Sequence, residues 1–254
     1  MNAPIPLPTR QNKVPVPGLS ILVPAFNEEH TIATVLTHLH QLTLPEPLAK
    51  EIIVVNDCST DQTALRLREF QAAHPDCPLR VCHFDRNQGK GAALRQAISM
   101  AGLEYLVVQD ADLEYDPLEF GILLQPLLSG RADVVYGSRF MGGNPHRILF
   151  FWHTVGNKFL TLCSNALTNL NLTDMETCYK MMRTHLVQGL QLRENRFGFE
   201  PEITAKISRV PGVRIYEVGI SYYGRTYAEG KKINWKDGFR ALYCIAKYNL
   251  WSKN

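Results

Sequence analysis

The stretch VVQDADLEYDP, residues 107–117, joins the end of an apolar run to a dense acidic cluster. The run YLVVQ (105–109) has the length and composition of a buried β-strand. Four acidic residues follow within seven positions: Asp110, Asp112, Glu114 and Asp116. Carboxylates this close repel one another. Either water on a surface loop or a cation in a binding site must therefore compensate their charge.

Similar junctions occur on both sides of this stretch. Further apolar runs occupy residues 19–23, 51–55, 79–84 and 132–139. The segments between the runs have helical character; the first has apolar residues at positions 32, 35, 36, 39 and 42, which is the helical period. Short strands that alternate with helices predict βαβ units. The expected fold class is therefore α/β, with a mostly parallel central sheet and helices on both faces.

Polar motifs follow three of the predicted strands. They are PAFNE (24–28), NDCSTD (56–61) and DADLE (110–114). In sheets of this kind, ligands bind beyond the C-terminal ends of the strands. Three polar clusters at strand ends therefore favour one site along that edge of the sheet over three unrelated surface loops.

The two ends of the chain differ from this alternating series. Residues 1–18 hold five prolines, which predicts a disordered, extended arm, and they lack the apolar core of a signal peptide. Residues 19–254 are predicted to form a single domain that ends in an amphipathic helix over residues 234–251. One stripe of that helix carries Phe239, Leu242, Tyr243, Ala246 and Leu250. No apolar run reaches the roughly 18 residues of a membrane span, so we expect the chain in the cytoplasm.

Charge is unevenly distributed along the chain. The net charge is +3, but residues 225–254 hold seven Lys and Arg against two acidic residues, a balance of +5 that leaves −2 for the rest. This predicts an anionic partner near the C-terminal end, although a solvated helix face explains the charges equally well. We expect no nucleic acid among the partners. The six cysteines form no CxxC pair, so they indicate reduced thiols, and any metal should have oxygen ligands.

The acidic cluster suits a divalent cation. Asp110 and Asp112 flank Ala111 just beyond a strand, so their carboxylates can share an ion or divide it between protein and ligand. Mg²⁺ and Mn²⁺ prefer carboxylate oxygens and usually share their other positions with phosphates and water. Such an ion would hold the diphosphate of a nucleotide-linked substrate and offset the charge on the departing diphosphate.

Several motifs together resemble a known family. PAFNE, NDCSTDQT, NQGKGAALRQA, DADLEYDP and GSRF, in this order and spacing, resemble glycosyltransferase family 2. The later TDMETCYKMMR, FGFEPEI and GRTYAEGKKI are similar to the dolichyl-phosphate and polyprenyl-phosphate sugar transferases of that family. The resemblance extends from about Leu19 to about Phe239. It implies a nucleotide-sugar-binding fold of the GT-A type, with residues 19–254 as the catalytic domain.

The resemblance also implies a donor site. The nucleoside would be held by Pro24, Phe26, Glu28, Val55 and Asp57. Phe26 stands where the family usually has tyrosine, which keeps an aromatic face and loses a hydroxyl. The usual DDGS is NDCS here and keeps Asp57, which would hydrogen-bond the base. Ribose and diphosphate would contact Asp110, Ala111 and Asp112, and Mg²⁺ or Mn²⁺ would be bound by Asp112 as principal ligand with Asp110 and Glu114.

Positive groups and a further acid complete the implied catalytic set. Arg139 resembles the family arginine that contacts the donor, while Arg225 and Lys231 match an arginine and a lysine of a mobile loop that closes over phosphates. Lys90, in QGKG, either contacts the donor or stands among glycines that allow close backbone approach to it. Asp174 lies where many inverting relatives place a general base. A phosphate acceptor hardly needs one, so Asp174 could instead orient the sugar or brace its loop. The same ambiguity applies to Glu176, Glu200 and Glu202.

The predicted function is metal-dependent, inverting transfer of a hexose to polyprenyl or dolichyl phosphate. The donor would be of the GDP-mannose or UDP-glucose type. The alternatives are a soluble glycan or phosphorylated small molecule as acceptor, a nucleotidyltransferase, and a binding protein with a retired active site. A lipid acceptor requires contact with the cytoplasmic face of a membrane. The apolar segment 146–162 and the basic helix 234–251 fit an interfacial element, unless both pack on the sheet, and a membrane-anchoring partner subunit is a further expected partner.

Overall fold

The protein is built around one seven-stranded sheet. Its computed structural model describes residues 16–45, 47–142, 147–148, 150–226 and 235–252. The strand order is β3-β2-β1-β4-β6-β5-β7. The strands are β1 (Val16–Ala25), β2 (Ala49–Asn56), β3 (Leu79–His83), β4 (Leu103–Val108), β5 (Val134–Ser138), β6 (Lys180–Arg183) and β7 (Ile215–Gly219). β6 runs antiparallel to both of its neighbours, and every other pairing is parallel. The predicted mostly parallel sheet is therefore present.

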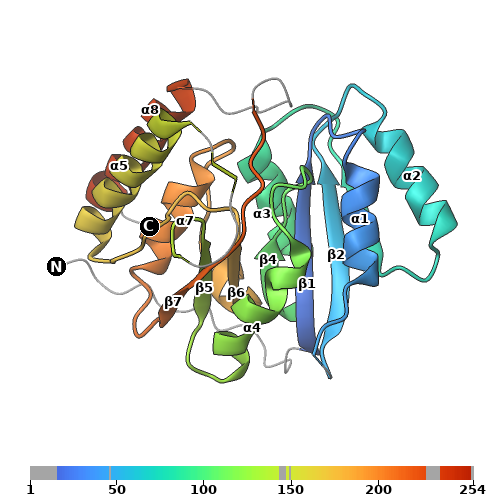
Figure 1. Ribbon diagram of the computed structural model, residues 1–254, viewed down its shortest axis with the longest axis horizontal. Helices are drawn as coiled ribbons and strands as arrows, with labels where there is room; N and C mark the ends of the chain where they lie inside the picture. The colour runs from blue at the N-terminus through green and yellow to red at the C-terminus, as the bar shows by residue number, and fades with distance from the viewer. Residues whose placement is uncertain (1–15, 46, 143–146, 149, 227–234, 253–254) are drawn as a thin grey trace.

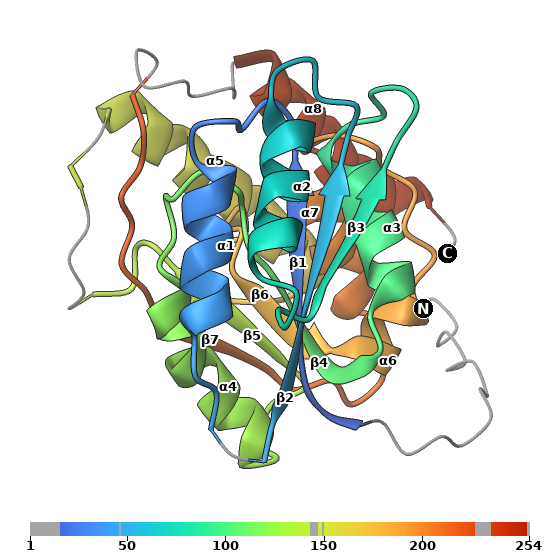
Figure 2. The same cartoon turned by 90° about the vertical axis from the view of Figure 1, so that its right-hand side faces the viewer.

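Helices cover both faces of this sheet. They are α1 (Ile32–Gln41), α2 (Thr63–Ala73), α3 (Lys90–Met100), α4 (Phe120–Leu128), α5 (Phe151–Thr168), α6 (Thr184–Gln188), α7 (Phe199–Ile207) and α8 (Trp235–Ala246). Viewed from the β3 edge, α1 and α4 lie on one face of the sheet and α3 and α6 on the other (Figure 2). α5 and α8 pack against each other beyond the β7 side (Figure 1).

The central strands form because they are continuous apolar runs that can be buried on both faces. Leu19, Ile21, Leu22 and Val23 in β1 are fully buried, as are Ile52 to Val55 in β2. The first helix buries Ile32, Val35, Leu36 and Leu39, which are the positions that the helical period selects. The C-terminal ends of β1, β2 and β4 are thereby held by strands that are buried in the core.

The N-terminal boundary differs from the expected one. β1 begins at Val16, three residues before the expected start at Leu19, because Gly18 pairs with Ala49 and Val16 pairs with Leu103. The remainder of the expected arm, residues 1–15, lies outside the described residues.

The C-terminal helix turns its predicted apolar stripe away from the protein. α8 continues into a π-helical turn, Lys247–Trp251. Its buried side carries Ala241, Cys244, Ile245 and Tyr248, and Cys244 and Tyr248 pack against Ala205 of α7. Phe239, Leu242, Tyr243 and Leu250, all members of the predicted stripe, are exposed. The sequence pattern therefore identified an apolar face, but not one that packs on the sheet.

Candidate active site

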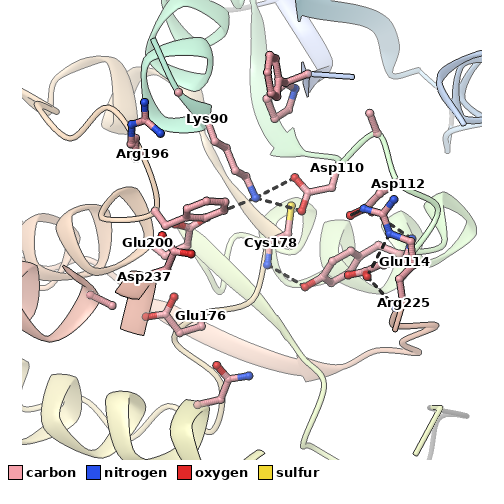
Figure 3. A pocket seen from close by; sticks show the side chains of 18 of the residues that line it. Lys90, Asp110, Asp112, Glu114, Glu176, Cys178, Arg196, Glu200, Arg225 and Asp237 are labelled. Carbon is pink, nitrogen blue, oxygen red and sulfur yellow. Dashed lines mark hydrogen bonds and ion pairs between the residues drawn. The ribbon is translucent and has the colours of Figure 1, made fainter. Parts of the chain in front are cut away.

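A cavity of about 770 Å³ opens where β1, β2 and β4 end and extends towards α5 and α8 (Figure 3). Most of the sequence-predicted site residues line it: Pro24, Phe26, Glu28, Asp57, Lys90, Asp110, Ala111, Asp112, Glu114, Arg139 and Arg225. Val55 does not, because it lies inside β2 with no exposed surface, so its predicted contact with the nucleoside is not supported. Asp174 is fully buried behind the wall. Lys231 lies outside the described residues.

The loop after β1 and the loop after β2 form one wall of the cavity and are joined by hydrogen bonds. Asn27 adopts a left-handed backbone conformation, with φ of 52°, and its Oδ1 accepts a hydrogen bond of 2.8 Å from the N–H of Thr60. The N–H of Glu28 donates to Oγ1 of Thr63 at 2.9 Å. These bonds fasten the loop after β1 to the loop after β2. Phe26 and Glu28 are held at the cavity wall as a result.

Asp57 organises the neighbouring wall. Its carboxylate accepts hydrogen bonds of 2.7 Å from the backbone N–H groups of Gln88 and Gly89, and one of 3.0 Å from Nδ2 of Asn87. These donors stand at the start of α3, where backbone N–H groups lack helical partners. The observed role of Asp57 is to attach α3 to the end of β2. The nucleobase contact that the resemblance implies would use the acceptor capacity that remains.

The glycines of QGKG serve a packing role. Gly89 has φ of +97°, and a Cβ there would lie 2.4 Å from the carbonyl oxygen of Asn195. At Gly91 a Cβ would lie 2.4 Å from the carbonyl oxygen of Glu194. Close backbone approach was predicted here, but the approach is to the 194–195 segment of the protein itself rather than to a donor. Packing of this segment brings the neighbouring Arg196 to the cavity.

Two cations of the protein compensate the acidic cluster. Nζ of Lys90 lies 2.9 Å and 3.0 Å from the two carboxylate oxygens of Asp110 (Figure 3). Arg225 donates to Asp112 at 2.8 Å, and its backbone N–H donates to Glu114 at 2.8 Å. Glu114 also accepts a hydrogen bond of 2.7 Å from the hydroxyl of Tyr222. Asp110, Asp112 and Glu114 therefore lie in a site and not on a solvated loop, whereas Asp116 lies outside it.

The compensation at Asp112 is incomplete. Burial, together with the charges of Asp110 and Glu114, raises the pKa of Asp112 to about 7, although Arg225 opposes the shift. Burial alone would lower the pKa of Lys90, but Asp110, with Cys178 and Glu200, raises it well above its ordinary value. Burial is the larger cause of this shift, and the smaller part that comes from Asp110 and Glu114 is a repulsion that an additional cation would relieve.

The donor set fits Mg²⁺ or Mn²⁺ in chemistry, but not as three converging protein ligands. Oxygen atoms from Asp110, Asp112 and Glu114 do not all approach within 4.8 Å of one another. Glu114 accepts from two donors, the hydroxyl of Tyr222 and the backbone N–H of Arg225, so its predicted ligand role is not supported. Asp110 and Asp112 are paired with Lys90 and Arg225, and an ion bound by these two acids would have to displace those side chains, with its other positions filled by oxygens of a ligand and water. Among the described residues, three potential ligands do gather at His40, His74 and Asp76, outside the cavity.

Arg139 is fixed by an ion pair that faces away from the solvent. Its Nε and Nη2 donate to the two carboxylate oxygens of Asp174 at 2.7 Å and 2.8 Å, and its backbone N–H donates to Asp174 at 3.1 Å. The guanidinium also lies 5.2 Å from the centre of the Tyr222 ring. This geometry makes Asp174 the brace of Arg139. As a buried group it has no access to an acceptor, so the general-base alternative is not supported.

The three other acids that the sequence left ambiguous separate into two kinds. Glu202 is fully buried and structural, because it accepts hydrogen bonds of 2.7 Å from the N–H of Glu194 and from Nζ of Lys206. Glu176 and Glu200 both line the cavity. Burial and the charge of Glu200 raise the pKa of Glu176 to about 8.

Some cavity residues were not predicted. They include Asn87, Tyr115, Cys178, Arg196, Tyr222 and, from α5 and α8, Trp152, His153, Asn157 and Asp237. Asn87 begins the NQGKG motif and could have been found from it. The residues of α5 and α8 carry no comparable sequence signal, since only the fold brings these helices to the cavity.

The fold is similar to solved structures of a sugar transferase. Glucosyl-3-phosphoglycerate synthase from Mycobacterium tuberculosis, crystallised with Mn²⁺, UDP and glucosyl-3-phosphoglycerate, matches with a TM-score of 0.69 at 20% identity, over 92% of this chain and 80% of that one. The same enzyme has also been crystallised with Mg²⁺ and UDP. The likeness confirms a GT-A-like α/β fold.

The chain belongs to glycosyl transferase family 2, whose model matches residues 20–189. Dodecaprenyl-phosphate galacturonate synthase of Rhizobium johnstonii is 27% identical over 230 residues, which are 88% of this chain and 65% of that protein. Dolichol-phosphate mannosyltransferase of Pyrococcus furiosus is 26% identical over 236 residues, which are 91% of this chain and 64% of that protein. The chain thus spans less than two thirds of these two relatives. The family prediction is confirmed.

Proposed function

We propose that this protein transfers a hexose from a nucleoside diphosphate sugar to a polyprenyl phosphate with the aid of Mg²⁺ or Mn²⁺. The observation that carries the proposal is the lining of one cavity, which brings together the implied nucleoside contacts Phe26 and Asp57, the acids Asp110 and Asp112, and the cation Arg139. A volume of about 770 Å³ is within the range of small-molecule sites. Both relatives named above are polyprenyl-phosphate or dolichol-phosphate sugar enzymes by name, which supports the acceptor class.

In the proposed reaction the acidic residues bind the cation and the arginines contact phosphate groups. When bound at Asp112 and Asp110, a divalent ion would neutralise the diphosphate as it departs. Arg139, held by Asp174, provides a fixed positive charge at the wall for a phosphate. Arg225 exchanges its contacts with Asp112 for contacts with the ligand's phosphates. The acceptor phosphate attacks the anomeric carbon, the bond from that carbon to the diphosphate breaks, and the nucleoside diphosphate leaves with the bonding electrons.

A soluble phosphorylated acceptor is the second candidate. It is favoured by the structural likeness to an enzyme crystallised with phosphoglyceric acid, although at 20% identity that likeness concerns the fold. The two acceptors differ in one physical requirement. A polyprenyl phosphate keeps its chain in the bilayer, so the protein must dock on a membrane surface.

Two neighbouring helices offer such a docking surface. We define the α5–α8 apolar face as exposed apolar residues of these two packed helices, Phe151, Trp152, Phe159 and Leu162 on α5 and Phe239, Tyr243, Leu250 and Trp251 on α8 and its final turn. Trp152 is 78% exposed and Phe151 is 69% exposed, and the cavity is lined by residues of both helices. Exposed aromatic side chains on neighbouring amphipathic helices are typical of interfacial binding. None of the helices in the described part of the chain has the length and hydrophobicity to cross a bilayer.

Donor binding can be tested by thermal stabilisation. Purified protein is heated with a panel of UDP- and GDP-sugars, each with Mn²⁺ and with EDTA. A ligand at about 100 times its dissociation constant should stabilise the native state by about 2.7 kcal/mol, seen as a rise in melting temperature. We expect one nucleotide class to stabilise the protein only when the cation is present. Stabilisation by none of them would contradict the proposed function.

Membrane docking can be tested with a charged double variant. Leu162→Glu with Leu250→Glu puts two carboxylates on the α5–α8 apolar face, where both leucines are largely exposed, so the fold should be kept. Each lost apolar contact with lipid is worth about 1.5–3 kcal/mol, so partitioning into anionic vesicles should fall about tenfold or more. Sedimentation with phosphatidylglycerol vesicles measures it. The matched control is Leu65→Glu with Leu128→Glu, exposed leucines on α2 and α4 (Figure 1). Equal binding by the two double variants would contradict docking through this face.

A further inference from the structure

One carboxyl group on the cavity wall has no assigned partner. Among the described residues, Oε1 of Glu176 is closed off from solvent and has no hydrogen-bond partner. The side chain nevertheless lines the cavity, where Figure 3 shows it on the same side as Glu200. An unpaired buried acceptor costs free energy and is uncommon in native proteins, so it requires an explanation.

The charged neighbours of Glu176 are all engaged elsewhere. Arg139 is in its ion pair with Asp174. Lys180 donates to the carbonyl of Thr177 and lies over the ring of Tyr136. Glu200 faces Lys90, with 3.6 Å between Oε1 and Nζ. Lys180 and Arg139 attract Glu176 through their charge, but neither donates a hydrogen bond to its Oε1, which keeps hydrogen-bonding capacity for a ligand.

The position of Glu176 matches one part of a nucleotide sugar. Such a donor is linear, with nucleoside, diphosphate and sugar in that order. With the nucleoside beside Phe26 and Asp57 and the diphosphate beside Asp112, the sugar falls further along the cavity. Glu176 and Glu200 lie across the cavity from Asp112, on the side of Lys90 away from it (Figure 3).

We propose that Glu176, with Glu200 beside it, forms a subsite that binds hydroxyl groups of the transferred hexose and selects among sugars. This inference rests on the proposed function. A carboxylate accepts hydrogen bonds from hydroxyl groups, and a protonated carboxyl group also donates one, so either form suits a sugar. A phosphate in the same place would add further negative charge beside Glu200, whose charge already contributes to the raised pKa of Glu176. Sites built to bond a substrate hydroxyl discriminate strongly against substrates that lack it or direct it elsewhere.

The test measures how the variant Glu176→Gln changes two affinities: that for the nucleotide sugar and that for the corresponding nucleoside diphosphate. The amide keeps the shape of the side chain and is neutral, so the cavity wall should remain intact. Calorimetric titration with Mn²⁺ present measures the affinity for the nucleoside diphosphate alone and for the matching nucleotide sugar. We expect less than a twofold change for the first and a loss of at least tenfold for the second. Discrimination between two hexoses on the same nucleotide, measured as a ratio of kcat/KM values, should fall by a similar factor, and Glu176→Asp should recover part of it.

Two controls separate the outcomes. Glu69→Gln, an exposed glutamate outside the cavity, should leave both affinities unchanged. Equal losses for the nucleoside diphosphate and the nucleotide sugar in Glu176→Gln would overturn the subsite, because they would indicate a general structural effect; unchanged affinities would overturn it as well. If the unaltered protein binds no nucleotide sugar, the proposed function fails and the subsite with it.

Discussion

Replacing Asp112 by asparagine should reduce sugar transfer at least about a thousandfold while the protein remains folded. The side chain provides the principal cation ligand of the proposed site, and a thousandfold loss corresponds to about 4 kcal/mol of barrier. Burial and the neighbouring acids already disfavour the charged form of this group, whose pKa is raised to about 7. A neutral amide should therefore be tolerated, and Arg225 keeps its contact with Glu114.

Turnover and donor-induced stabilisation should be measured together at controlled Mn²⁺ concentrations. In Asp112→Asn, the part of the stabilisation that depends on the cation should disappear. Asp116→Asn is the matched control, since Asp116 belongs to the same acidic stretch but accepts a hydrogen bond from the N–H of Leu118 and does not line the cavity. Its turnover should stay within about threefold of the unaltered protein. Full activity in Asp112→Asn, or equal losses in both variants, would remove Asp112 from the mechanism.

Replacing Asp174 by asparagine should lower the free energy of unfolding by about 3–5 kcal/mol, because it leaves the buried charge of Arg139 without its counter-ion. For a chain of this size the melting temperature should fall by about 10 °C. Urea denaturation measures the change. Arg139→Met should also destabilise, and the double variant should lose less than the sum of the two single losses, because the pair is coupled.

An exposed ion pair serves as the control for the loss of unfolding free energy in Asp174→Asn. Glu69 pairs with Arg66 at 3.0 Å on α2, and both side chains are about half exposed. Glu69→Gln should cost less than about 0.5 kcal/mol. If Asp174→Asn costs no more than this control, the bracing of Arg139 by Asp174 has no energetic importance, and the role proposed for the pair is wrong.

The sequence predicted the parts of the fold that depend on continuous apolar runs. β1, β2 and β4 were recognisable because strands buried on both faces need uninterrupted apolar side chains. β6 was not, because its four residues, KMMR, lie inside a motif and gain their strand conformation from pairing with β4 and β5. Likewise, the period of α8 located an apolar stripe but could not show which side of the helix the rest of the protein covers.

The candidate site was predictable where residues follow strands directly. Asp57, Asp110 and Asp112 stand at strand ends, so topology alone gathers them. Which partner each side chain takes could not be predicted. Asp110 is bound to Lys90 from α3, a contact made by packing between distant segments. Asp174 and Glu176 are two residues apart, yet one is buried behind the wall and the other lines the cavity, a difference set by the path of the chain into β6.

Arg225 bridges two walls of the cavity. It touches Asp112 at 2.8 Å and lies 3.6 Å from Glu28, so the acids after β4 are joined to the loop after β1 by a guanidinium that belongs to the same chain. A tethered competitor has a high effective concentration that dilution cannot reduce. In the proposed metal site a free dication would have to displace it, which would weaken binding of the metal alone. Donor phosphates would give the released guanidinium a new anion, so metal and donor should bind with positive cooperativity.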